Sequence, residues 1–199
     1  VKMADKRELR LVLASPGDVQ AERAALVAVV EELNHGLCRG HEVWLDLVRW
    51  DMDGAPGFHP DGPQGRLDPV LRIAEGGLLI GIFWKHFGTP THGVQSGTEH
   101  EFLTAYQAWK KQGRPQIMVY FNQRPPALNT AAEAEQLRQM LDFRERFPQE
   151  GLAWSYRGKV DFERQVRQHL SHFIVREVPK VASTTKPASR TSRRRTRTA

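Results

Sequence analysis

Apolar and polar residues follow two periods along this chain, and the two periods predict alternating strands and helices. Residues 9–14 read Leu-Arg-Leu-Val-Leu-Ala, an apolar strand, and residues 15–18, Ser-Pro-Gly-Asp, supply a turn and a helix start. In that helix apolar residues recur at helical spacing and form one stripe: Val19, Leu26, Val30, Leu33 and Leu37. A second strand is predicted over residues 43–50.

The rest of the chain repeats this alternation. Residues 78–84 are hydrophobic on both faces, which is typical of a central strand in a sheet that helices cover on both sides. Two more strands are predicted over residues 116–121 and, at an edge, 152–156. Further helices are predicted over residues 67–75, 131–147 and 160–175, and a helix that begins near residue 96 carries the stripe Phe102, Ala105, Tyr106 and Trp109.

This order of elements indicates a single three-layer, flavodoxin-like α/β domain over residues 1–177. We expect five parallel strands in the order 2-1-3-4-5, joined by right-handed crossovers. In such sheets ligands bind beyond the carboxyl ends of the strands where the order reverses, here between the first and third strands. Two loops rich in Gly and Pro, over residues 51–65 and 87–97, interrupt the pattern, and the length of the first is typical of a mobile or functional loop.

Charge divides the chain into two parts. Lys and Arg number 29 against 23 Asp and Glu, giving a net charge of +6, but seven of these cations and no acid lie in residues 178–199. Residues 1–177 are therefore almost neutral. We expect residues 178–199 to be a disordered basic tail, whose contact with nucleic acid is at most non-specific because no aromatic side chain is interleaved for base stacking.

Several function classes are disfavoured by composition. Cys38 is the only cysteine, so no disulfide forms within the chain, and His169 with His172 lacks an evident third metal ligand, so no metal is expected. The longest apolar run is far shorter than the ~20 residues that cross a bilayer, which predicts a cytoplasmic protein without a membrane partner. Neither G-x-G-x-x-G nor G-x-x-x-x-G-K-[ST] occurs, so a dinucleotide fingerprint and an ATPase are not supported.

Three segments are expected to meet at the predicted ligand edge. They are residues 15–18 after the first strand, residues 84–97 after the third strand, and the helix start at residues 96–101. Glu101 lies in the first turn of that helix and shares a face with Ala105, so it borders the buried stripe. Glu101 is therefore the leading candidate for a functional carboxylate.

Two family resemblances rest on these segments. Gly-Thr-x-x-Glu at residues 97–101, after a hydrophobic strand, resembles the signature of nucleoside deoxyribosyltransferases, whose glutamate is a nucleophile. Residues 11–23, 81–90 and 96–102 together resemble more closely the TIR-like domain of unknown function found at the N-termini of large signalling ATPases. This second resemblance covers roughly residues 8–125.

The resemblance implies that Glu101 occupies the position of the catalytic glutamate of Toll/interleukin-1-receptor-like NAD hydrolases. NAD or a related nucleotide is then the substrate, and no cofactor is needed. Cleavage of its N-glycosidic bond expels neutral nicotinamide, so one carboxylate that stabilises or traps the oxocarbenium-like centre suffices. Relatives of this type act as assembly-dependent effectors in immunity, which implies self-association or a signalling partner.

The same resemblance suggests ligand contacts. Aromatic rings at the end of the third strand would stack on nicotinamide or adenine, although Trp84 also fits a core position. A hydroxyl and backbone amides after the first strand would hold ribose hydroxyls or the pyrophosphate, because helix N-termini attract anions. The predicted contacts are Ser15, Gly17, Trp84, Phe87, Ser96 and Thr98.

Simpler interpretations of these residues remain open. Thr98 with Glu101, and Ser96 with Glu99, each match a capping box, and Asp18 fits an N-cap. If Glu101 only caps its helix, the domain is a non-catalytic interaction module in a signalling or defence assembly. Deoxyribosyl transfer is a third possibility, and the loop after the first strand fits it less well.

Overall fold

The computed structural model describes residues 6–49, 60, 68, 71–88 and 96–178. They form a five-stranded sheet in the order β2-β1-β3-β4-β5, in which every neighbouring pair is parallel. The predicted α/β class and the strand order 2-1-3-4-5 are therefore confirmed. The predictions for the tail and for the two Gly- and Pro-rich loops fall almost entirely outside the described residues.

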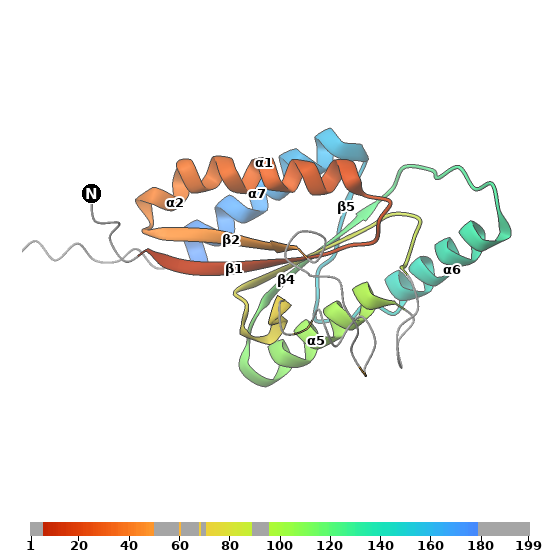
Figure 1. Cartoon of the computed structure of the whole chain (residues 1–199), viewed down its shortest axis with the longest axis horizontal. Helices are drawn as coiled ribbons and strands as arrows, with labels where there is room; N and C mark the ends of the chain where they lie inside the picture. The colour runs from red at the N-terminus through yellow and green to blue at the C-terminus, as the bar shows by residue number, and fades with distance from the viewer. Residues whose placement is uncertain (1–5, 50–59, 61–67, 69–70, 89–95, 179–199) are drawn as a thin grey trace, which may run out of the picture.

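The elements follow the predicted alternation (Figure 1). The strands are β1 (Arg7–Ala14), β2 (Val43–Arg49), β3 (Leu78–Phe83), β4 (Gln116–Asn122) and β5 (Trp154–Tyr156). The helices are α1 (Gln20–His35), α2 (Leu37–Gly40), α5 (Gly97–Gln112), α6 (Ala131–Glu145) and α7 (Gly158–Glu177), with a 3-10 turn η1 (Ile73–Glu75). Of the helix predicted over residues 67–75, the structure describes mainly this last turn. None of the described helices is both long and apolar enough to cross a membrane.

Two helical layers enclose the sheet. Figure 1 shows α1, α2 and α7 on one face and α5 and α6 on the other. Alternation along β1 sends Leu11 and Leu13 into the cluster with α1 and α7, and Val12 and Ala14 into the cluster on the opposite face. Every residue of β3 is buried, as its two-sided hydrophobic pattern predicted.

A separate aromatic cluster fills the space between β3, β4 and the helices α5 and α6. Ring centroids of neighbouring members lie 5.1–6.3 Å apart, within the range of favourable aromatic pairs. The members are Phe83, Phe87, Phe102, Phe121, Phe143 and Phe147. This cluster fixes α5 and α6 against the carboxyl half of the sheet.

Asn34 covers the outer edge of the sheet at β2. Its side-chain Nδ2 donates to the Leu45 carbonyl at 2.9 Å, and its Oδ1 accepts from the Leu45 amide at 2.8 Å. The side-chain amide thus takes the place of a further strand at this position, which protects an otherwise unpaired edge.

Replacing Asn34 by alanine should leave the buried Leu45 amide and carbonyl without partners. We expect Asn34→Ala to lower the free energy of unfolding by about 2 kcal/mol in urea denaturation. The matched control is Asn129→Ala, at an exposed asparagine, which should change the unfolding free energy little. Equal unfolding curves for the two variants would contradict this role of Asn34.

Candidate functional site

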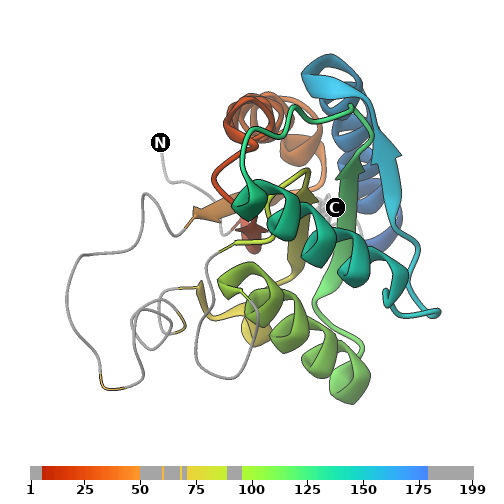
Figure 2. The same ribbon diagram turned by 90° about the vertical axis from the view of Figure 1, so that its right-hand side faces the viewer.

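The carboxyl ends of β1 and β3 bring the first two predicted segments together. Figure 2 looks onto this edge, with the start of α1 and the start of α5 on opposite sides of the sheet. Ala14 pairs with Gly81 in the β1–β3 register, so the residues that follow each strand leave the sheet side by side. This is the point at which the strand order reverses, where open α/β sheets bind ligands.

Arg23 fixes the loop that follows β1. Its Nε donates to the Ser15 hydroxyl at 2.9 Å, and its Nη2 donates to the Ser15 carbonyl at 2.6 Å and the Pro16 carbonyl at 3.2 Å. Arg23 and Ser15 are both buried. Sequence reasoning assigned no role to Arg23, because its partners became visible only when the first turn of α1 was placed against the loop.

Glu101 lies in this buried region with an unsatisfied carboxyl group. The residue is 3% exposed, and its Oε2 has no hydrogen-bond partner among the residues that the structure describes. Burial raises the pKa of Glu101 to about 8, while the positive charge of Arg23 lowers it and the negative charge of Asp68 raises it. The protonated form of Glu101 therefore predominates at neutral pH in the absence of a ligand.

The capping interpretation of Glu101 is wrong. Ser96 is the N-cap of α5, and its hydroxyl accepts a hydrogen bond from the Glu99 amide at 3.0 Å. The predicted pairing of Ser96 with Glu99 is thus confirmed on the serine side. A capping box pairs the N-cap residue with the residue three positions later, which for Ser96 is Glu99. Thr98 lies inside the helix and is not its N-cap, so Glu101 is not at the capping position.

Ser96 and Thr98 are buried where α5 begins, close to Gly88 in the loop that follows β3. A Cβ atom on Gly88 would lie 3.0 Å from the Ser96 Cβ and 3.7 Å from the Thr98 hydroxyl oxygen. Gly88 also has a φ of +111°, which side-chain-bearing residues rarely adopt. Glycine at residue 88 therefore allows the loop to approach the start of α5.

Asp18 joins the loops after β1 and β3. Its Oδ2 accepts hydrogen bonds from the Lys85 and His86 amides, each at 3.0 Å. The prediction that Asp18 caps the first helix was wrong: Val19 is the N-cap of α1, and no side-chain cap bond is formed there. Two amides from the neighbouring strand end compete successfully for the Asp18 carboxylate.

Helix α6 holds the next two amides of the same loop. The Gln136 Oε1 atom accepts from the Phe87 and Gly88 amides, each at 3.0 Å. The Lys85 ammonium also pairs with the Glu133 carboxylate at 2.8 Å. Four successive backbone amides, residues 85–88, are therefore fixed by side chains from two sides, and the sequence pattern gave no signal for this contribution of α6.

The two predicted stacking rings have different environments. Phe87 is 0% exposed and packs against Phe83 and Phe143 in the aromatic cluster, so its ring serves the core. Trp84 is half-buried, and its indole Nε1 donates to the Arg124 carbonyl at 2.9 Å. Of the two rings, only Trp84 retains exposed surface next to the loop.

Gly17 lies at the exposed start of α1, where its carbonyl accepts from the Gln20 side chain at 3.3 Å. Within the part of the chain that the structure describes, the N-cap residue Val19 provides no side-chain cap for the first-turn amides of α1. The structure thus brings Ser15, Ser96, Thr98 and Glu101 to the carboxyl edge and leaves Gly17 and part of Trp84 at its surface.

A second polar cluster, missed by sequence reasoning, continues along the same edge. Asn122 Nδ2 donates to Glu22 Oε1 at 3.4 Å, and Asn122 Oδ1 accepts from the Arg124 amide at 3.0 Å and the Gly158 amide at 3.4 Å. Burial, followed by the negative charge of Glu22, raises the pKa of the neighbouring Tyr156. This cluster connects α1 to the ends of β4 and β5.

Among the described residues, no group of three or more His, Cys, Asp or Glu is placed to hold a metal ion.

Comparisons with known proteins give no family. No family model matches the chain, and no curated protein matches it. The solved structure of apo translation elongation factor SelB from Methanococcus maripaludis has 13% identity and a TM-score of 0.44, covering 89% of this chain and 37% of that one. The solved structure of a flavodoxin, WrbA-like protein from Agrobacterium tumefaciens has 10% identity and a TM-score of 0.36, covering 87% of this chain and 99% of that one. At these values neither likeness bears on function, and the fold class rests on the strand order itself.

The raised pKa of Glu101 predicts how stability changes with pH. Since the pKa rises from 4.5 in the unfolded chain to about 8 in the fold, the folded chain holds a proton in this range that the unfolded chain has lost. This contribution to stability is fully present below pH 4.5 and declines as the pH rises through 8. The decline is at most about 1.4 kcal/mol per pH unit.

Glutamine has nearly the same shape and does not titrate. We therefore expect the stability of Glu101→Gln relative to the unchanged protein to increase between pH 5 and pH 8 in urea denaturation. Glu99→Gln, in the same turn of α5, is the control for a general charge effect. Parallel pH profiles for the unchanged protein and Glu101→Gln would show that Glu101 titrates normally.

Proposed function

We propose that this chain cleaves the N-glycosidic bond of NAD or a related nucleotide, with Glu101 as the catalytic carboxylate. The observation that carries the proposal is the buried Glu101 Oε2, which has no hydrogen-bond partner among the described residues and lies close enough to Arg23 of α1 to be affected by its charge. A buried carboxyl group whose ionised form is penalised by burial is destabilising to the fold when it ionises, and functional sites are where such groups are retained.

The chemistry needs little more than one carboxylate. In NAD the bond between the ring nitrogen and the anomeric carbon breaks, and its electron pair goes to the ring, so a cationic ring leaves as neutral nicotinamide. No general acid is required. Ionised Glu101 stabilises the positive anomeric carbon or forms an ester with it. Water then attacks that carbon, releases the Glu101 carboxylate if an ester has formed, leaves its hydroxyl on the ribose product and gives up one proton to solvent.

Charge explains how a carboxyl group with a raised pKa performs this role. In the unliganded protein burial favours the neutral form, and the positive charge of Arg23 only partly opposes it. A positively charged nicotinamide ring beside Glu101 would favour the carboxylate, since an opposite charge at close range lowers the pKa of an acid. The substrate thus promotes ionisation of the group that acts on it.

The surrounding residues position the ligand. Arg23 holds Ser15, and Asp18 and Gln136 hold the loop that carries Trp84. The uncapped first turn of α1, next to Gly17, offers backbone amides to a pyrophosphate. Ser96 and Thr98 border the same edge from α5, and we assign the Phe87 ring to packing.

A non-catalytic interaction module is the second candidate function. It is favoured by the hydrogen bonds that already engage the Ser15 and Ser96 hydroxyls, and by the burial of the Phe87 ring, which leave fewer groups for a nucleotide. In that case the edge stabilises the domain, and the domain acts by docking to a signalling partner or to a second copy.

The direct test measures nicotinamide release from NAD by the concentrated 199-residue chain, because relatives of the resembled type act in assemblies. We expect turnover whose kcat/KM rises with pH toward about 8, where the free Glu101 ionises. Glu101→Gln should lower kcat by on the order of 100-fold or more, because glutamine cannot ionise. Glu99→Gln should retain turnover within a few-fold of the unchanged protein.

Equal turnover by the unchanged protein and Glu101→Gln would remove Glu101 from the mechanism. The interaction module would be favoured if the protein bound no nucleotide at millimolar NAD but formed a stable complex with a partner protein or with a second copy of itself. Base exchange on deoxynucleosides without nicotinamide release would instead identify deoxyribosyl transfer.

A further inference from the structure

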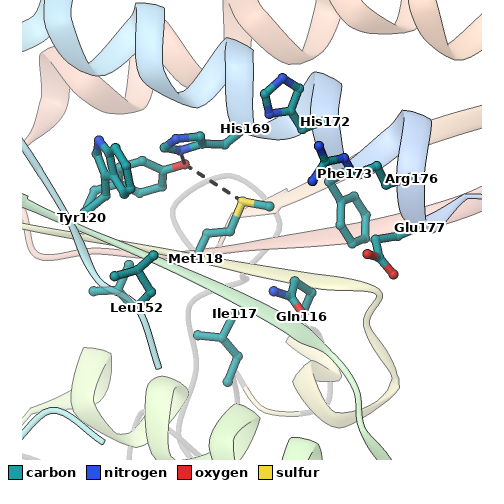
Figure 3. A pocket seen from close by; sticks show the side chains of 12 residues that line it. Gln116, Ile117, Met118, Tyr120, Leu152, His169, His172, Phe173, Arg176 and Glu177 are labelled. Carbon is teal, nitrogen blue, oxygen red and sulfur yellow. Dashed lines mark hydrogen bonds between the residues drawn. The ribbon is translucent and has the colours of Figure 1, made fainter. Parts of the chain in front are cut away.

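A cavity of about 410 Å³ lies on the other face of the sheet from Glu101 (Figure 3). It is bounded by β4, the segment that leads into β5 and the C-terminal half of α7. Its volume is within the range of sites that bind small molecules. The residues that matter for its chemistry are Met118, Tyr120, Trp154, His169, His172 and Arg176.

One side of this cavity is apolar and aromatic. Met118 of β4 is half-buried in it, whereas Trp154 is 43% exposed and Leu152 is 79% exposed. The Trp154 ring meets His169 edge to face at a centroid distance of 4.9 Å. Large exposed apolar side chains around a concave surface are typical of a binding site.

The opposite side carries nitrogen donors from a single face of α7. His169, His172 and Arg176 are spaced at i, i+3 and i+7, so they share that face, and Figure 3 shows them along the helix. Neither His172 nor Arg176 forms an ion pair or hydrogen bond within the described part of the chain. An arginine fork of this kind matches the geometry of a carboxylate.

Tyr120 sets the orientation of the first of these donors. Its hydroxyl lies 2.9 Å from His169 Nδ1, far closer than the 3.9 Å to the Met118 sulfur. Burial raises the pKa of Tyr120, and burial with the charges of His172 and Arg164 lowers the pKa of His169. The Tyr120 hydroxyl has one proton to donate. In the tautomer of the neutral ring whose Nδ1 accepts that proton, the N–H of His169 lies on Nε2, away from Tyr120.

We propose that this cavity binds a small aromatic monocarboxylate. The ring lies against Trp154 and Met118, and the carboxylate accepts hydrogen bonds from His169, His172 and Arg176. Glu177, the acidic residue among the described lining residues, offsets part of the positive charge and disfavours ligands with several negative charges. The ligand does not occupy the Glu101 edge, so the inference is independent of the proposed function.

Benzoate is the probe, added to the 199-residue chain and followed by calorimetry and by NMR of the histidine side chains. We expect saturable binding with a Kd on the order of 1 mM, as for a ligand of this size. Benzyl alcohol, which has no charge, and acetate, which has no ring, should bind about tenfold more weakly or not at all. Equal affinity for acetate and benzoate would overturn the aromatic part of the proposal.

Variants test the donor side of the cavity. Arg176→Gln should weaken benzoate binding by about tenfold, as expected for loss of a charged hydrogen bond. Arg138→Gln, at an exposed arginine of α6, should leave it unchanged. Tyr120→Phe should weaken binding and change the ¹⁵N shifts of His169 toward a mixture of tautomers, which a purely structural effect on the fold would not produce.

An absence of saturable benzoate binding by the folded, unchanged protein would overturn the proposal. Binding that is unaffected by Arg176→Gln would do the same, because the donors of α7 would then serve only the negative C-terminal end of their helix. Neither result depends on whether the protein turns over NAD.

Discussion

The candidate site depends on the burial of the Glu101 carboxyl group, which removes it from water. A buried acid without a hydrogen-bond partner favours its neutral form, and the nearby Arg23 charge only partly compensates. Around it, Asp18 and Gln136 accept hydrogen bonds from four consecutive amides after β3, and Arg23 binds the loop after β1.

The sheet could be predicted from the sequence because the hydrophobic pattern within each strand reflects which of its faces are buried. Strand β3 is buried on both faces, and its sequence is a continuous hydrophobic run. Along β1, alternate side chains enter the hydrophobic clusters on the two faces of the sheet. Parallel strands with short crossovers then allow few strand orders. The position of Glu101 at the carboxyl edge followed from the same pattern.

The side-chain contacts of the site could not be predicted, because they depend on which distant groups compete. Asp18 satisfies the local rule for an N-cap, yet its carboxylate binds amides that are 67 and 68 residues away. Ser96 and Thr98 both match a capping pattern, and only the placed helix shows that Ser96 is the cap. Gln136 and Tyr120 have no local signal at all, since their roles arise from the packing of α6 and α7 on the sheet.

In the proposed function, Glu101 responds to the positive charge of a nucleotide substrate. The most direct measurement is the pKa of this residue, read from ¹³C-labelled glutamate by NMR with and without NAD, with Glu101→Gln to assign the signal. We expect a pKa of about 8 in the free protein and a clear decrease when NAD binds. An ordinary glutamate pKa in the free protein, or a raised pKa that NAD leaves unchanged, would contradict it.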